Sequence, residues 1–112
     1  YIKRRIFMAH WVVVTYERPN TGVAWFTPSS EILDLATEFQ NTEPKKITSY
    51  EKSESADGLK QYYKIAFKDN ATYTEFENTS KGQNNITARV NYLNENGINY
   101  WIDHHGETEP TL

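Results

Sequence analysis

The sequence contains no cysteine, and this absence excludes disulfide bonds and thiolate chemistry. It also lacks an apolar run long enough to span a membrane. Of the 112 residues, 38% are hydrophobic and 24% are charged, a balance typical of one folded domain. An excess of positive charge is missing too, because 12 basic residues face 15 acidic ones. Nucleic-acid binding needs a concentrated positive face. We therefore expect a cytoplasmic protein with neither nucleic acid nor membrane as partner.

Motifs that carry chemistry are equally scarce. The chain has no Gly-rich phosphate loop, no H-E-x-x-H metal motif, no Ser-His-Asp set and no acidic metal cluster. We therefore predict no cofactor and no bound metal. Aromatic residues are abundant instead, at 14% with eight Tyr and three Trp, which indicates large contact areas inside the domain or between subunits.

Residues 10–17, HWVVVTYE, are the centre of the predicted fold. The run is short and rich in β-branched Val, which favours a strand over a helix. Because it is apolar at odd and even positions alike, we expect both of its faces to be covered. The only methionine, Met8, lies just upstream, so residues 1–7 either precede the true start or extend this strand.

Two segments with clear periodicity follow. Thr27 as N-cap and Pro28 at the first helical position predict a helix that ends by Thr42, with one apolar stripe formed by Ile32, Leu35, Ala36 and Phe39. Residues 47–55 are polar enough for a strand at a sheet edge. A turn at residues 56–58 then leads to a strand at 59–68, whose alternation is the cleanest in the chain.

The last third predicts a second helical region and a final strand. Asp69 or Asn70 caps the helical region, Gly82 interrupts it and Gly97 closes it. Its apolar face comprises Tyr73, Phe76, Ile86, Val90 and Leu93. The strand covers residues 98–104. We predict a single domain over residues 1–112, with 1–8 as a candidate extension and 106–112 as a frayed tail.

This order of elements predicts an α+β, ferredoxin-like βαββαβ fold. Two right-handed crossovers give a four-stranded antiparallel sheet of order 4-1-3-2, with two helices on one face. The opposite face is too apolar to be left in water. We expect a second copy to cover it across a two-fold axis, through the predicted interface residues Trp11, Val13, Tyr62, Ala66 and Trp101.

The strand YYKIAF and the helix-to-strand join NYLNENGINYWI resemble the dimeric ferredoxin-like α/β-barrel superfamily, which includes antibiotic-biosynthesis-type monooxygenases. The resemblance covers residues 9–103 as a pattern of elements and extends to uncharacterised small dimeric proteins from environmental sequences. It implies a dimeric α/β barrel and activities that range from cofactor-free oxygenases to haem enzymes and isomerase-like proteins. Haem degraders of this superfamily use an Asn-Trp-His set with the His on the second helix, whereas residues 71–96 contain no His.

Two groups of residues are candidate sites. If Val12 lies opposite Ile102, then His10 lies opposite His104 and Trp101 opposite Val13, and the two His with Asp103 or His105 would bind a metal or pass protons. The alternative that we favour is a solvated cross-strand pair. The second candidate is a pocket between sheet and helices for an aromatic ligand, lined by Trp25, Tyr63, Arg89 and Tyr100. The alternative that we favour is that these rings fill an ordinary core, and Arg89 would equally suit the surface.

These observations leave three hypotheses open. The first is a homodimer that binds a small ligand without catalysis. The second is a cofactor-independent monooxygenase or isomerase, whose substrate anion is held by Tyr, Trp or His donors. The third is a structural component of a larger assembly. An enclosed cavity with inward-pointing hydroxyl groups would favour the enzyme, and a fully packed interior would remove it.

Overall fold

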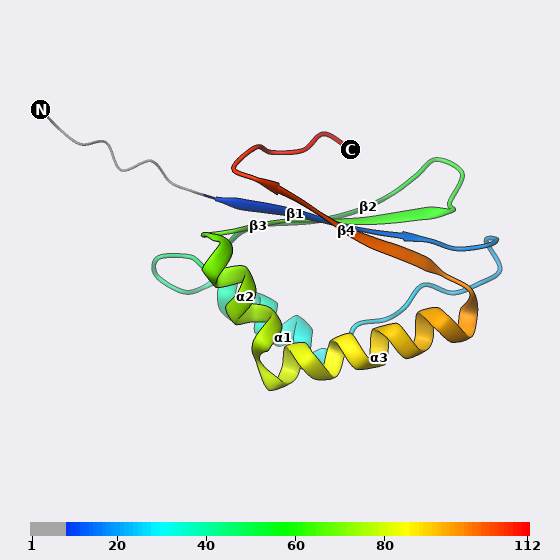
Figure 1. The fold of residues 1–112 in the computed structure, drawn as a ribbon, viewed down its shortest axis with the longest axis horizontal. Helices are drawn as coiled ribbons and strands as arrows, with labels where there is room; N and C mark the ends of the chain where they lie inside the picture. Colours follow the sequence, from blue (N-terminus) through cyan, green and yellow to red (C-terminus); the bar gives the residue numbers. More distant parts are fainter. Residues whose placement is uncertain (1–8) are drawn as a thin grey trace, which may run out of the picture.

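The computed structural model describes residues 9–112, whereas residues 1–8, with Met8 and the candidate extension, lie outside the described residues. Figure 1 shows the elements in chain order. They are β1 (His10–Glu17), α1 (Ser30–Gln40), β2 (Ile47–Glu54), β3 (Lys60–Phe67), α2 (Asn70–Asn78), α3 (Ser80–Asn96) and β4 (Asn99–Gly106). Every helix within residues 9–112 is too short or too polar to cross a bilayer.

The four strands form one antiparallel sheet in the order β2-β3-β1-β4. This confirms the predicted ferredoxin-like topology, which is 4-1-3-2 when it is counted from the other edge. Strand β1 lies inside the sheet between β3 and β4, which explains why it is apolar at successive positions. The helices all lie on one face of the sheet (Figure 1). The predicted α+β architecture is therefore confirmed.

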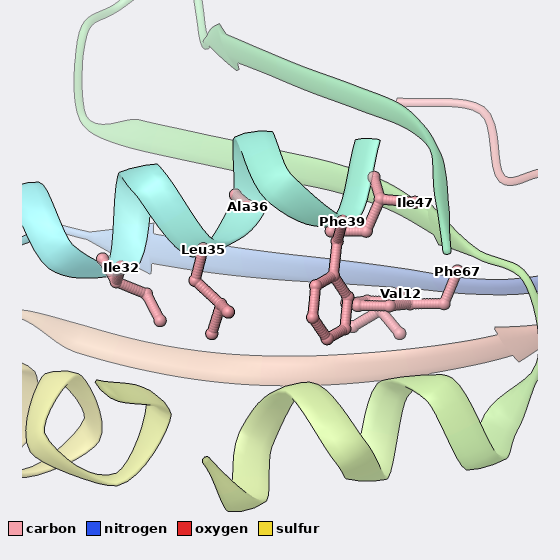
Figure 2. Close-up of a cluster of buried hydrophobic side chains, with 7 residues drawn as sticks. All are labelled: Val12, Ile32, Leu35, Ala36, Phe39, Ile47 and Phe67. Carbon is pink, nitrogen blue, oxygen red and sulfur yellow. The ribbon is translucent and has the colours of Figure 1, made fainter. Parts of the chain in front are cut away.

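The centre of the core lies between α1 and the sheet. Ile32, Leu35, Ala36 and Phe39 are the buried residues of α1, which confirms the predicted stripe. Figure 2 shows Leu35 and Phe39 pointing from α1 toward Val12 and Phe67 on the sheet. Burial of each such large side chain contributes about 1.5–3 kcal/mol to folding, so this cluster anchors α1.

Helix α1 begins later than the sequence predicted. Its N-cap is Ser29 rather than Thr27, and the Ser29 hydroxyl accepts a hydrogen bond from the Ile32 N–H at 3.3 Å. Pro28 therefore precedes the helix instead of opening it. The Ser29 side chain thereby satisfies a backbone N–H of the first helical turn. Thr27 lies two residues earlier and does not cap the helix.

The second helical region is two helices, so the face carries three helices where two were predicted. The helical region is interrupted at Thr79. The Thr79 hydroxyl accepts a hydrogen bond from the Gly82 N–H at 2.9 Å and so caps the N-terminus of α3. Gly82 lies inside the first turn of α3, where a Cβ would meet the Phe76 carbonyl and lie 2.8 Å from that of Glu77. Gly82 therefore permits the close approach of the two helices rather than ending one.

The inward face of α3 also differs from the prediction. Its buried residues are Gly82, Arg89 and Leu93, whereas Ile86 and Val90 are only partly buried. Apolar spacing pointed to Ile86 and Val90, but the close approach at Gly82 sets the rotation of the helix. Arg89 consequently faces the interior.

The register between β1 and β4 is shifted by two residues from the prediction. Ile102 pairs with Val14 and His104 pairs with Val12. The reason lies at the end of α3, where Gly97 adopts a left-handed conformation and the Ile98 N–H donates to the Leu93 carbonyl at 3.0 Å. Ile98 is thus used in the helix cap, and β4 begins at Asn99.

The helix-free face of the sheet carries the predicted interface residues. Val13 and Ala66 are buried there, Trp11 and Tyr62 are partly buried, and Trp101 is 40% exposed. We expected residues 106–112 to be frayed, but the chain turns at Gly106, and Figure 1 shows its last segment above the side of the sheet away from the helices.

The ion pair between Lys64 and Glu109, at 2.8 Å, joins this last segment to β3. Pro110 is buried. The C-terminal segment therefore covers part of the helix-free face.

Candidate functional site

A cavity lies between the sheet and the helices. Its volume is about 90 Å³, which is room for several water molecules at about 10–15 Å³ each. The cavity therefore has room for an organic molecule of about one or two rings. Its lining is mostly apolar and aromatic, and it includes Val12, Val14, Phe26, Ile65, Phe67, Phe76 and Ile102.

Four tyrosines line the cavity from the sheet and from α2: Tyr16, Tyr50, Tyr63 and Tyr73. Burial raises the pKa of each of them, and it raises that of Tyr63 to about 12. The Tyr16 and Tyr50 rings both meet Tyr63 edge-on, at centroid distances of 6.0 and 6.1 Å. At neutral pH these phenols keep their protons, so each can donate a hydrogen bond to a bound molecule.

Glu77 is the only carboxylate on this wall among the described residues. It lies on α2, where the Tyr73 hydroxyl donates to its Oε1 at 3.4 Å. Burial raises the pKa of Glu77, against the smaller opposing effects of Arg89, Tyr73 and His104. A carboxylate with a raised pKa beside an apolar cavity is the usual arrangement for a general base or acid.

Arg89 and Asn85 face the cavity from α3, one helical turn apart. Arg89 is only 8% exposed, and its guanidinium lies 5.3 Å above the Tyr100 ring. Its Nε and the Oδ1 of Asn85 are buried without a hydrogen-bond partner in residues 9–112. One wall of an apolar cavity therefore presents an unused donor and an unused acceptor.

The structure brings two of the predicted pocket residues, Tyr63 and Arg89, onto the cavity wall. Trp25 lies outside the lining, where it packs near Tyr16 with the Arg18 guanidinium 4.3 Å over its ring. Tyr100 is 38% exposed and meets Arg89 from the side away from the cavity lining. These two aromatic residues support the wall rather than form it.

His10 and His104 meet although the predicted register was wrong. Their Nε2 and Nδ1 atoms are 2.9 Å apart on the helix-facing side, because side chains two positions apart on adjacent strands still reach one another. Both rings contact Tyr73, at centroid distances of 5.7 and 5.0 Å. Within residues 9–112 no three His, Asp or Glu side chains converge as a metal site requires. The pair lies beside the cavity and not in its lining.

Sequence reasoning missed Glu77, Asn85 and Tyr73 as site residues. A usable signal for Glu77 existed, because it follows Phe76 and lies four residues after Tyr73, and so continues the predicted apolar face. Asn85 carries no such signal. Its position depends on the rotation of α3, which the sequence did not reveal.

No protein-family model matches the chain, and no curated protein matches it either. Solved structures do. The chain is similar to a conserved Bacteroides thetaiotaomicron protein of unknown function that is named as a possible oxidoreductase. The TM-score is 0.57 and the sequence identity is 10%, and the match covers 90% of this chain and 99% of that chain. It is likewise similar to a Caulobacter crescentus protein named, provisionally, as an antibiotic biosynthesis monooxygenase, with a TM-score of 0.57, 14% identity, and 95% and 93% covered.

The chain has the fold of these proteins. The resemblance drawn from the sequence is thereby confirmed at the level of the fold. Since one fold serves many activities, the chemistry has to be argued from the cavity.

Proposed function

We propose that the protein is a cofactor-independent monooxygenase that acts on a small hydroxylated aromatic molecule in the cavity. The observation that carries the proposal is Glu77, a carboxylate of raised pKa on the wall of an aromatic cavity. Its neighbours support the same role, because Arg89 and the tyrosine hydroxyls would stabilise a substrate anion. The name of the Caulobacter crescentus neighbour is in line with this chemistry.

The reaction begins when Glu77 accepts the proton of a substrate hydroxyl group. The phenolate spreads its charge onto a ring carbon, which forms a bond to dioxygen. The O–O bond then breaks as that carbon loses its hydrogen, so one oxygen atom stays as a carbonyl and the other leaves in water. Dioxygen is reduced and the substrate supplies all the electrons, so the balance needs only these two reactants.

An isomerase would use the same first step, and this is the second catalytic candidate. Glu77 would take a proton from carbon beside a carbonyl group and return it elsewhere on the same molecule. The same Arg89 and tyrosine donors would stabilise the enolate. Binding without catalysis, our first expectation from the sequence, leaves a carboxylate of raised pKa in the cavity without a use.

The test measures oxygen uptake and solvent deuterium exchange by the purified protein with a panel of monohydric phenols, naphthols and enolisable aryl ketones, in the presence of a metal chelator. We expect uptake above the uncatalysed rate, lost in Glu77→Gln and retained in Glu107→Gln, the same change at an exposed position outside the cavity. Substrate-dependent solvent deuterium exchange without oxygen uptake would favour the isomerase. Neither uptake nor exchange with any member of the panel would overturn both catalytic candidates and leave binding alone.

We also propose that the protein forms a homodimer through its helix-free face. Trp101 is 40% exposed there and lies across Thr15 from the partly buried Tyr62, while Trp11 lies farther along the same face. Large aromatic rings on one exposed face are typical of an interface. The C-terminal segment covers only part of this face. The cytoplasmic location stays a prediction from the sequence.

Sedimentation of the wild type and of Trp101→Glu tests the dimer. A charge at the centre of an apolar contact should release single protomers. The matched control, Tyr100→Glu, places the same charge one residue away on the other face of β4 and should leave the dimer intact. A wild type that sediments as a single protomer contradicts the dimer.

A further inference from the structure

Arg89 is a buried cation that lacks an anion. It is 8% exposed, and no ion pair within residues 9–112 joins it to a carboxylate. The Tyr100 ring at 5.3 Å contributes a cation–π contact from one side. A buried charge without a counter-ion is costly, so a ligand anion that pairs with Arg89 would offset that cost.

Asn85 adds a second requirement on the same wall. Its Oδ1 is buried and unpartnered among the described residues, so it needs a donor rather than another acceptor. Residues four apart on a helix have Cβ atoms about 5–6 Å apart. A ligand that serves both groups must therefore carry an anionic acceptor and a neutral donor at two separate positions on its frame.

We propose that the cavity selects an aromatic carboxylic acid, with its carboxylate on Arg89 and a meta hydroxyl or amino group donating to Asn85. The meta position suits the spacing, because an ortho group lies too close to the carboxylate to reach a side chain one turn away. The tyrosine rings and Phe67 supply the flat apolar surface that receives the ring. This inference rests on the proposed function only for the location of the site, since binding needs no turnover. The group that donates to Asn85 is separate from the hydroxyl that Glu77 deprotonates in the proposed reaction, so a substrate that is turned over carries both groups.

Glu77 is the alternative partner for Arg89. It lies on the neighbouring helix α2, yet no ion pair joins the two in the described part of the chain. Its carboxyl is hydrogen-bonded to Tyr73 instead. The ligand's carboxylate can therefore accept a hydrogen bond from the Nε–H of the Arg89 guanidinium.

Calorimetric titration compares three probes that differ by one group: 3-hydroxybenzoate, benzoate and 3-hydroxybenzamide. We expect the wild type to bind 3-hydroxybenzoate most tightly, benzoate more weakly, and the neutral amide about tenfold or more below the acid. Arg89→Gln should weaken binding of both acids about tenfold or more. Lys64→Gln, which removes a positive charge on the helix-free face, is the matched control and should bind as the wild type.

Asn85→Leu keeps the inference testable if Arg89→Gln does not fold. This variant should bind benzoate as the wild type does and lose the preference for 3-hydroxybenzoate. Equal binding of the amide and the acid overturns the inference, and so does no binding of either acid at millimolar concentration. Glu77→Gln should bind the acids even where it abolishes oxygen uptake, so failure of the proposed function and failure of this inference are distinguishable.

Discussion

The space between the sheet and the helices has two unlike parts. Around Leu35 and Phe39 of α1, apolar side chains from helix and sheet fill the interior, and Ile47 beside them is almost wholly buried. Along α2, α3 and the first turns of α1 the interior is hollow. Its wall carries the Glu77 carboxylate, together with a guanidinium and an amide that each have an unused hydrogen-bonding atom. Both parts contact the same sheet.

The difference separates stability from chemistry within one small domain. Close packing around Leu35 and Phe39 contributes free energy that holds the fold, and nothing in that part needs a ligand. The hollow part forgoes packing and keeps polar groups that would each be destabilising in an empty core. Residues of equal burial should consequently respond differently to substitution, according to the part in which they lie.

Phe39→Ala should give the largest effect, because it opens a void in the packed part. We expect a loss of about 3–5 kcal/mol in the free energy of unfolding, measured by urea denaturation. Leu33→Ala, on the same helix at a position that is 44% exposed, is the control and should change stability by less than about 1 kcal/mol. Equal losses for the two would contradict the packed character of this part.

Gly82→Ala tests the junction that shapes the hollow part. The new Cβ would meet the backbone carbonyls of Phe76 and Glu77, which cannot rotate away as a side chain would. We expect a loss of about 1–3 kcal/mol in the free energy of unfolding and weaker binding of aromatic ligands. The control is Asn84→Ala, an exposed position on the same turn. A Gly82→Ala variant as stable as the wild type would show that α2 and α3 can separate freely.

The packed part was predictable from the sequence, and the polar wall was not. The stripe Ile32, Leu35 and Phe39 has only one way to be buried, so periodicity alone assigned it. The rotation of α3 depends instead on the contact at Gly82, which joins two helices and leaves no periodic trace.

Arg89 was assigned to the pocket or to the surface for this reason. The register of β4 could not be predicted from the sequence for a similar reason. Its first residue is fixed by the helix cap at Gly97 and Ile98, a contact that the apolar alternation of the strand does not encode.

Glu77 should make stability depend on pH in the hollow part. Burial raises the pKa of Glu77 above its ordinary value of 4.5, so above pH 4.5 the folded state holds a proton that the unfolded state has lost. The free energy of unfolding should therefore fall as the pH rises from 4.5 through the raised pKa.

The measurement is the urea midpoint across this interval for the wild type and Glu77→Gln. The variant should lack the slope, and Glu107→Gln, at an exposed position, should keep it. A slope that persists in Glu77→Gln would assign the dependence to another group.

His10 should give a smaller dependence of the opposite sign, at the edge of the hollow part. Burial lowers the pKa of His10 below 6.5, and His104 lowers it further, so the unfolded chain takes up the proton first as the pH falls. Stability should be complete above pH 6.5 and decline toward the lowered pKa. The effect is small because the pair is exposed. His10→Asn should remove the dependence of the urea midpoint on pH below 6.5, whereas His105→Asn should keep it. Identical curves for the two variants would mean that folding does not lower the pKa of His10.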